Sequence, residues 1–333
     1  MKKLFSRRRR RELVVALGFL LPNFTGFLVF TIGPVLFSLV VSFSNWNLQR
    51  TVPFQWIGLA NFRELLHSQE FWLYFINTGY LMLGMPLAIG GSLVLAILLS
   101  QNLRGIVVYR TLFYLPTFTS GVALMILWKA LYNPDFGAIN AVINGILTHL
   151  HLRELLGLFG LGDVTAPQWL LSTRNLLGVH VEEVRLTASQ WGIGARDAII
   201  LMGIWTAIGG NNMLLYLAGI TNIPQDLFEA AQLDGAGRWA MFRHVTWPQL
   251  APTTFFIVVM SFIGGLQGGF EQARVMTGGG PAGTTTTLSY HIYTKAFEEF
   301  QIGYASAISW ILFAIIFVVT LVNWKFGSKE LSY

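Results

Sequence analysis

Six blocks of the chain are apolar over lengths that only a membrane-embedded protein tolerates. The hydrocarbon core of a bilayer is about 30 Å thick, and a helix crosses it with about 20 apolar residues. Of the 333 residues, 54% are hydrophobic and only 11% are charged, too few charges for the wetted surface of a soluble protein. We therefore predict an all-α integral membrane protein with six transmembrane helices, over residues 13–41, 72–100, 111–131, 197–219, 251–271 and 304–324.

The distribution of positive charge predicts how the chain crosses the membrane. The net charge is +6, and much of it comes from Lys2, Lys3 and the run Arg7–Arg11, in a basic arm over residues 1–12. Basic residues beside a span mark the cytoplasmic side. Six spans place both termini on one side, so both are predicted to be cytoplasmic, including the tail 325–333. No basic surface interleaved with aromatic residues follows, which argues against nucleic-acid binding.

The first span reads as a retained helix, followed by an external loop within residues 13–71. Its apolar stretch is longer than the 7 to 15 residues typical of a cleaved signal peptide. A second external segment, about 138–196, is long for a connection between spans. We interpret it as a small external subdomain or a surface-lying helix. A seventh span over 139–161 is the alternative, but four polar residues interrupt that run: His149, His151, Arg153 and Glu154.

The segment 223–248, between the fourth and fifth spans, predicts a helix-turn-helix on the cytoplasmic side. Pro224 suits the first turn of a helix. Gly235 can adopt the left-handed geometry that ends a helix. A second short helix is predicted from Arg238 to Thr246, ending at Pro248 because proline lacks the backbone donor.

Small residues in the first helix of this segment leave a low surface for a second protein. Ala230 and Ala231 form that surface, and Glu229 offers a charge at its edge. The alternative is a helical hairpin that covers only the membrane face of its own protein.

Residues Glu229, Ala230, Ala231, Gly235, Val245, Trp247 and Pro248 resemble, in type and spacing, the EAA loop of binding-protein-dependent ABC importer permeases. Asp234, Gly235 and Ala236 resemble its extended form. Val245 and Trp247 depart from the usual Ile and Leu. In that family the loop docks into a cleft of a separate ATPase subunit. The resemblance implies a type I (MetI-like) permease core over about 72–324.

Other segments resemble the sugar-importing branch of this family: 42–47, 58–62, 110–116, 128–140, 277–281 and 303–307. The resemblance implies a plasma-membrane permease that imports a sugar or related polyol. Its implied partners are a second permease, as a heterodimer, two ATPase subunits that bind ATP and Mg²⁺, and an extracytoplasmic solute-binding protein. A secondary transporter or channel without an ATPase is the alternative. It should show acidic residues paired across inverted repeats, and the sequence shows no clear repeat or such pair.

No pattern of catalytic or metal-binding residues emerges. The chain has no cysteine, and its six histidines lack a paired metal-ligand spacing on a helix. The glycine-rich run continues with Ala282, Gly283 and Thr284, whereas a P-loop ends in Gly-Lys-Ser/Thr. We predict no enzymatic site, no metal and no cofactor on this chain. The run itself, Gly278, Gly279, Gly280 and Pro281, is predicted to be an external turn that contacts the binding protein; a flexible connector is the alternative.

Polar residues inside two spans predict where a substrate would pass. Such residues are costly in hydrocarbon and face a bundle interior or a cavity. The candidates combine amides, a carboxylate and aromatic faces: Trp205, Asn211, Asn212, Tyr216, Gln267 and Glu271. The alternative is that these amides, with the neighbouring glycines, serve helix packing alone. A further alternative is that the partner permease implied by the resemblance holds most of the substrate contacts.

Overall fold

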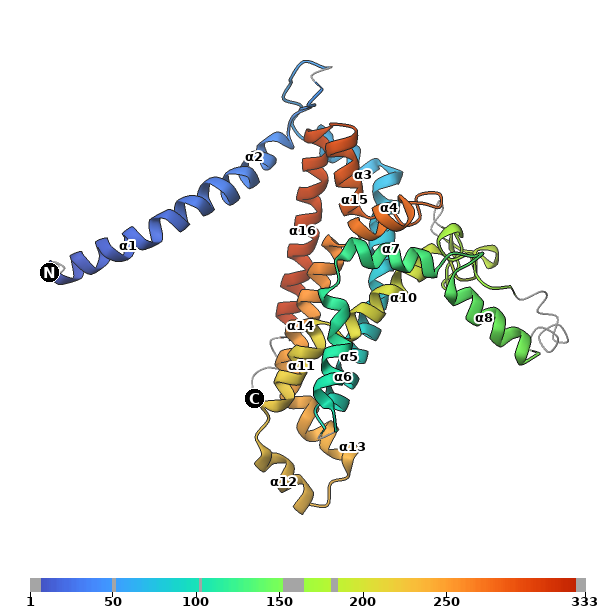
Figure 1. Ribbon diagram of the computed structural model, residues 1–333. Helices are drawn as coiled ribbons and strands as arrows, with labels where there is room; N and C mark the ends of the chain where they lie inside the picture. Colours follow the sequence, from blue (N-terminus) through green and yellow to red (C-terminus); the bar gives the residue numbers. More distant parts are fainter. Residues whose placement is uncertain (1–6, 50–51, 102–103, 152–164, 181–184, 328–333) are drawn as a thin grey trace. The chain divides into compact units, whose positions relative to one another are not determined.

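The computed structural model describes residues 7–49, 52–101, 104–151, 165–180 and 185–327, and most of them are helical (Figure 1). Lys2, Lys3, Arg153, Glu154 and residues 328–333 lie outside the described residues. Five helices are long and apolar enough to cross a membrane: Val14–Val41, Gln69–Leu99, Ala195–Thr221, Arg238–Gln267 and Ile302–Lys325.

The predicted third span is not a single helix. It consists of α6 (Ile106–Phe118) and α7 (Gly121–Leu131), whose axes meet at 97°. The span predicted over 111–131 is therefore broken into two helices and begins earlier, at residue 106. Thr119 and Ser120 take extended ψ angles of 135° and 130°, which no helix accommodates. The chain has five spanning helices among the described residues, or six if the bent pair counts as one.

The chain divides into two compact units, and the first consists of residues 1–67 and 292–311. Its helical elements are α1 (Arg7–Phe27), a π-helical turn η1 (Leu28–Ile32), α2 (Gly33–Val41), α3 (Ala60–His67), a second π turn η7 (Thr294–Glu298) and the first part of α16 (Ile302–Gly327). Asn61 attaches α3 to the loop after α2, because its Nδ2 donates to the carbonyls of Ser42 and Ser44 at 2.8 and 2.9 Å.

The second unit, residues 68–291 and 312–333, contains the helix bundle. It includes α4 (Gln69–Leu81), the 3-10 turn η2 (Met82–Gly84), α5 (Met85–Leu99), α6, α7, α10 (Ala195–Ile208), α11 (Asn211–Thr221), α14 (Trp247–Gln267), a π turn η6 (Gln272–Thr277) and most of α15 (Leu288–Tyr293). Ser68 caps α4 by accepting a hydrogen bond from the Phe71 backbone N–H.

Helices α5, α11 and α14 enclose the main core of this unit. Its fully buried side chains include Ala96 on α5, Met213 and Tyr216 on α11, and Leu250 and Ile257 on α14. Two helices can approach closely where one of them carries a glycine, which has no side chain, at the point of contact. A Cβ at Gly209, in the break between α10 and α11, would lie 2.0 Å from the Phe113 carbonyl oxygen of α6. Helix packing therefore accounts for this glycine.

The segment 138–196 folds into short elements that pack on one another. They are α8 (Ala138–His149), the 3-10 turn η3 (Trp169–Leu171), the antiparallel strands β1 (Val179–His180) and β2 (Arg185–Leu186), and a second 3-10 turn η4 (Ala188–Gln190). With 12 residues, α8 is about 18 Å long, too short to cross a bilayer.

Aromatic residues join this segment to the bundle. The buried Trp169 donates its indole N–H to the Asn140 side-chain oxygen at 2.7 Å, and its ring lies 4.9 Å from that of Tyr132. The Tyr132 hydroxyl donates to the Ala198 carbonyl at 2.8 Å, and burial raises the pKa of this tyrosine. The segment is therefore a small folded piece fixed to the start of α10.

Candidate functional site

The segment 223–248, here called the coupling loop, extends from one end of the bundle as α12 (Gln225–Leu233) and α13 (Arg238–Met241) (Figure 1). Gly235 has φ +79°, which confirms the predicted left-handed turn. The Ala236 N–H donates to the Ala231 carbonyl and the Gly235 N–H to the Gln232 carbonyl. These two hydrogen bonds form the Schellman motif that closes a helix before such a glycine.

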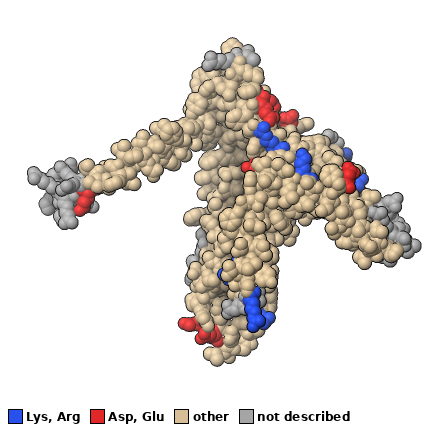
Figure 2. Space-filling model, in the orientation of Figure 1, with Lys and Arg blue, Asp and Glu red and all other residues tan. Residues whose placement is uncertain are grey.

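The coupling loop exposes both charged and large apolar side chains. Glu229 and Ala230 are exposed, as are Leu233 and Trp239, at 90% and 73%. Figure 2 shows acidic atoms over α12 and basic atoms over α13. Our sequence analysis missed Leu233, although it lies four residues after Glu229 and therefore on the same helix face. A surface with exposed large side chains at its centre and charges around them has the composition of a protein-docking site.

The second helix of the coupling loop does not end at Pro248, so that prediction is wrong. α13, a π-helical turn η5 (Phe242–Thr246) and α14 form one continuous helix from Arg238 to Gln267. Across η5 the Trp247 N–H reaches the carbonyl of Phe242, five residues earlier. Pro248 then falls in the first turn of α14, a position that tolerates a residue without a backbone donor.

This continuous helix, here called the coupling helix, joins the coupling loop to the interior of the bundle. Its 30 residues span about 45 Å. Val245, half-buried, and Trp247 and Pro248, both exposed, lie on it. Phe242 packs against the main core. The motif therefore includes the start of a long apolar helix and is not a separate appendage.

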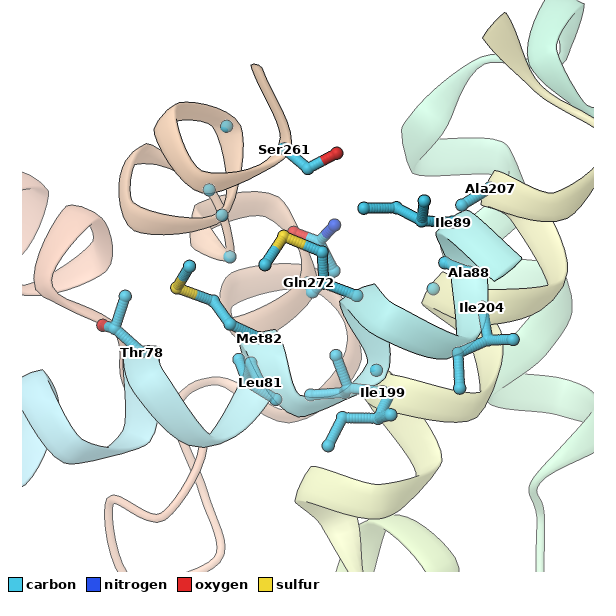
Figure 3. A pocket seen from close by; sticks show the side chains of 18 of the residues that line it. Thr78, Leu81, Met82, Ala88, Ile89, Ile199, Ile204, Ala207, Ser261 and Gln272 are labelled. Atoms are coloured by element: carbon cyan, nitrogen blue, oxygen red, sulfur yellow. The ribbon is translucent and has the colours of Figure 1, made fainter. Parts of the chain in front are cut away.

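A cavity of about 340 Å³ lies among α4, η2, α5, α10, α11 and α14. Its walls are mainly apolar, with the backbone of Gly264 and Gly265 of the coupling helix exposed to it. In Figure 3, the polar side chains of Thr78, Ser261 and Gln272 lie among apolar labelled residues. Asn212 and Thr287 also line the cavity. Mainly apolar walls with a few polar groups are typical of a small-molecule site.

Among the predicted pathway residues, only Asn212 lines this cavity. Tyr216 is fully buried in the main core. The Asn211 side-chain oxygen accepts a hydrogen bond from the Tyr114 hydroxyl at 3.1 Å. Trp205 lines a separate apolar groove between α6 and α10, with its ring 5.5 Å from that of Trp128. The structure therefore does not bring these candidates together.

The two remaining candidates lie at the far end of the coupling helix. Gln267 is its last residue and is exposed, and its carbonyl accepts a hydrogen bond from the Ser289 hydroxyl at 2.6 Å. Glu271 lies beyond the helix, because Gly268 and Gly269 interrupt it before the predicted end at residue 271. The Glu271 carboxylate lies next to Gly121 at the start of α7, where a negative charge complements the helix dipole.

The glycine-rich run is held in a fixed conformation by threonine side chains. Gly278 and Gly279 have φ angles of 63° and 86°. The Thr285 hydroxyl donates to the Gly280 carbonyl at 2.8 Å, and the Thr286 hydroxyl to the Gly279 carbonyl at 3.2 Å. These bonds favour a fixed turn over the flexible connector that the sequence left open.

A buried polar network anchors this turn to the bundle, and our sequence analysis missed it. Arg196 and Asp197, at the start of α10, are 1% and 2% exposed. The Arg196 Nε donates to the Thr284 carbonyl at 2.9 Å, and the Tyr80 hydroxyl donates to Asp197 at 2.8 Å. Asn77 also donates to the carbonyls of Gly283 and Thr286. The adjacent Arg-Asp pair at the edge of an apolar block was the available signal.

Several spanning helices, a cavity among them and a docking surface at one end define a membrane transport protein. The chain belongs to the family of binding-protein-dependent transport system inner membrane components, whose model matches residues 88–324. It is a permease subunit of an ABC importer, as the coupling-loop motif implied.

Individual relatives cover nearly the whole chain. The probable ABC transporter permease protein YesP of Bacillus subtilis (strain 168) is 34% identical, over 100% of this chain and 96% of its own. The trehalose/maltose transport system permease protein MalF of Thermococcus litoralis is 29% identical, over 97% of both. A crystal structure of a bacterial transporter that imports the polysaccharide alginate has a chain with a TM-score of 0.72 and 24% identity, over 96% of each chain. This likeness confirms the predicted permease fold.

Proposed function

We propose that this permease imports a neutral sugar or polyol, received from an extracytoplasmic binding protein and driven by two separate ATPase subunits that bind ATP and Mg²⁺. A second permease completes the pathway as a heterodimer. The sugar class is supported by relatives named for trehalose/maltose transport and multiple sugar-binding transport. Another relative is named for sn-glycerol-3-phosphate transport. The chain supplies the pathway and no catalytic groups.

The single observation that carries this proposal is the continuity of the coupling helix. Movement of the ATPase against Glu229, Leu233 and Trp239 would displace the start of a helix that lines the cavity further along, at Ser261 and Gly264. A packed helix moves as a rigid body. Docking outside the membrane would therefore change the shape of the cavity inside it and open it alternately to each side.

The cavity fits one small hydroxylated molecule. The amides of Asn212 and Gln272 offer both donors and acceptors for hydroxyl groups, and Ser261 offers a third polar contact. Gln267 and Glu271 would belong to the outer mouth, next to the fixed turn at Gly278–Pro281. That turn is our proposed contact for the binding protein. Trp205 and Asn211, which face other surroundings, would contact cargo only in another conformation.

Glu229→Lys tests the ATPase contact. The variant should lose most of the ATPase that co-purifies with the assembled importer, and uptake should fall with it, because a reversed charge in a docking surface opposes the partner. The matched control is Glu298→Lys, at another exposed glutamate, in η7. Full association and uptake in Glu229→Lys would contradict the proposal. A transporter without an ATPase would continue uptake when the ATPase genes are deleted.

The absence of cysteine from the native sequence allows a direct test of orientation. We propose that both termini and the coupling loop are cytoplasmic, and that residues 292–301 are external. In intact cells, a membrane-impermeant maleimide should label Glu298→Cys and leave Glu229→Cys unlabelled until the membrane is opened. Labelling of Glu229→Cys in intact cells would reverse the orientation and remove the ATPase from reach.

A further inference from the structure

The first unit contains a polar cleft of its own. It measures about 260 Å³, and its lining includes Trp46, Asn47, Asn61, Glu64, Gln301 and Tyr304. We propose that this cleft binds the ring of a neutral sugar, as an additional carbohydrate site between the loop after α2 and the start of α16. Its use in uptake rests on the proposed sugar import, whereas the binding itself does not.

The backbone holds the walls of the cleft together before any ligand binds. The Gly303 N–H donates to the Trp46 carbonyl at 3.0 Å, and the Leu48 N–H to the Phe300 carbonyl at 3.1 Å. A Cβ on Gly303 would lie 2.1 Å from the Ser44 carbonyl oxygen, so only glycine permits this approach. The start of α16 and the loop after α2 are therefore fixed against each other, and a preformed site loses little entropy when it binds.

Several polar atoms around the cleft have no hydrogen-bond partner within the described part of the chain. Asn61 is 5% exposed and uses both Nδ2 hydrogens on Ser42 and Ser44, which leaves its Oδ1 as an unused acceptor. Asn47 accepts from the Gln49 N–H through Oδ1, which leaves its Nδ2 as a donor. The Glu64 carboxylate and the Gln301 amide are also available. Hydroxyl groups, which donate and accept, match this mixture.

Aromatic side chains give the cleft an apolar surface. Trp46 is half-buried, and an edge contact with Phe37, with ring centroids 5.1 Å apart, fixes its plane. Tyr304 lines the cleft beside it. An aromatic face beside hydrogen-bonding groups suits the C–H face and the hydroxyls of a pyranose ring. Glu64 disfavours a carboxylate-bearing ligand by repulsion between like charges, so the site selects neutral sugars over uronates.

The test uses the full chain in lipid nanodiscs and saturation-transfer NMR with glucose, galactose and mannose as neutral probes. The double variant Glu64→Gln/Gln301→Ala should bind them about tenfold more weakly, because it neutralises one hydrogen-bond partner and removes another. The matched control Glu298→Gln/Gln49→Ala changes the same residue types outside the lining and should bind as the native chain does.

Three outcomes would overturn the proposal. They are no saturation transfer to any of the three sugars, equal affinity in the Glu64→Gln/Gln301→Ala variant, or tighter binding of glucuronate than of glucose. Glu229→Lys lies in a different part of the chain and should leave this binding unchanged. Failure of the proposed ATPase coupling would therefore appear in the co-purification experiment, and failure of the proposed cleft site would appear in the sugar-binding experiment.

Discussion

Asp197→Asn should strongly destabilise the fold, because Asp197 is the acceptor on which three chain segments converge. Its carboxylate accepts hydrogen bonds from the Tyr80 hydroxyl at 2.8 Å, the Gly194 N–H at 3.1 Å and the Leu176 N–H at 3.2 Å. An amide keeps one oxygen and turns an NH₂ group toward one or two of these donors. It also removes the negative charge beside the buried Arg196.

The expected loss is about 3 kcal/mol in the free energy of unfolding. A hydrogen bond to a charged group contributes about 1.5–3 kcal/mol, and one or two are lost. Tyr80→Phe removes only one donor and should cost about 1.5 kcal/mol. Because the two residues share a hydrogen bond, the double variant should be less destabilised than the sum by about 1 kcal/mol.

The measurement is equilibrium unfolding of the four proteins in detergent, followed by circular dichroism. The reasoning fails if Asp197→Asn stays within about 0.5 kcal/mol of the native chain, as a surface substitution would. It also fails if the effects of Asp197→Asn and Tyr80→Phe are strictly additive, since that would mean that the two side chains do not interact.

Two glycine pairs give further predictions. Gly209→Ala should lower the unfolding temperature strongly, because its Cβ would meet the Phe113 backbone, whereas Gly203→Ala, with open space around it, should be neutral or stabilising in the same thermal scan. Gly235→Ala should reduce ATPase co-purification, because left-handed geometry costs a residue with a Cβ about 1 kcal/mol. Gly237→Ala, with φ −72° and open space, should leave co-purification unchanged; equal effects of these two substitutions would refute the role of the turn.

The motifs in the sequence were sufficient to identify the family, and the local residue types were sufficient to predict the conformation of some turns. The order of Glu229, Ala230 and Ala231 before Gly235 indicated the family, and glycine at position 235 predicted the left-handed turn. Both depend on short stretches of chain, whose conformational preferences are encoded locally. The prediction at Pro248 was wrong because it used local preference alone, which ends a helix at proline. The π turn before Pro248 shifts the hydrogen-bond register and lets the helix continue.

Pathway residues could not be located in this way. Polar residues within an apolar block were reasonable candidates, yet Tyr216 packs in the core, Asn211 pairs with Tyr114, and Asn212 alone reaches the cavity. The direction of each side chain depends on how α10 and α11 are rotated at their break. At that break Gly209 lies close to the Phe113 backbone of α6, a contact between residues far apart in the sequence.

By itself, the sequence determined the membrane-spanning character and the family. These properties depend on the length of the apolar segments and on the spacing of the motif residues, and both can be counted in the sequence. Only the tertiary structure decided that the coupling loop continues into a helix lining the cavity, and that Arg196 and Asp197 anchor the glycine-rich turn. Those features arise where distant segments meet, because a buried polar group must find its partner wherever the fold places one.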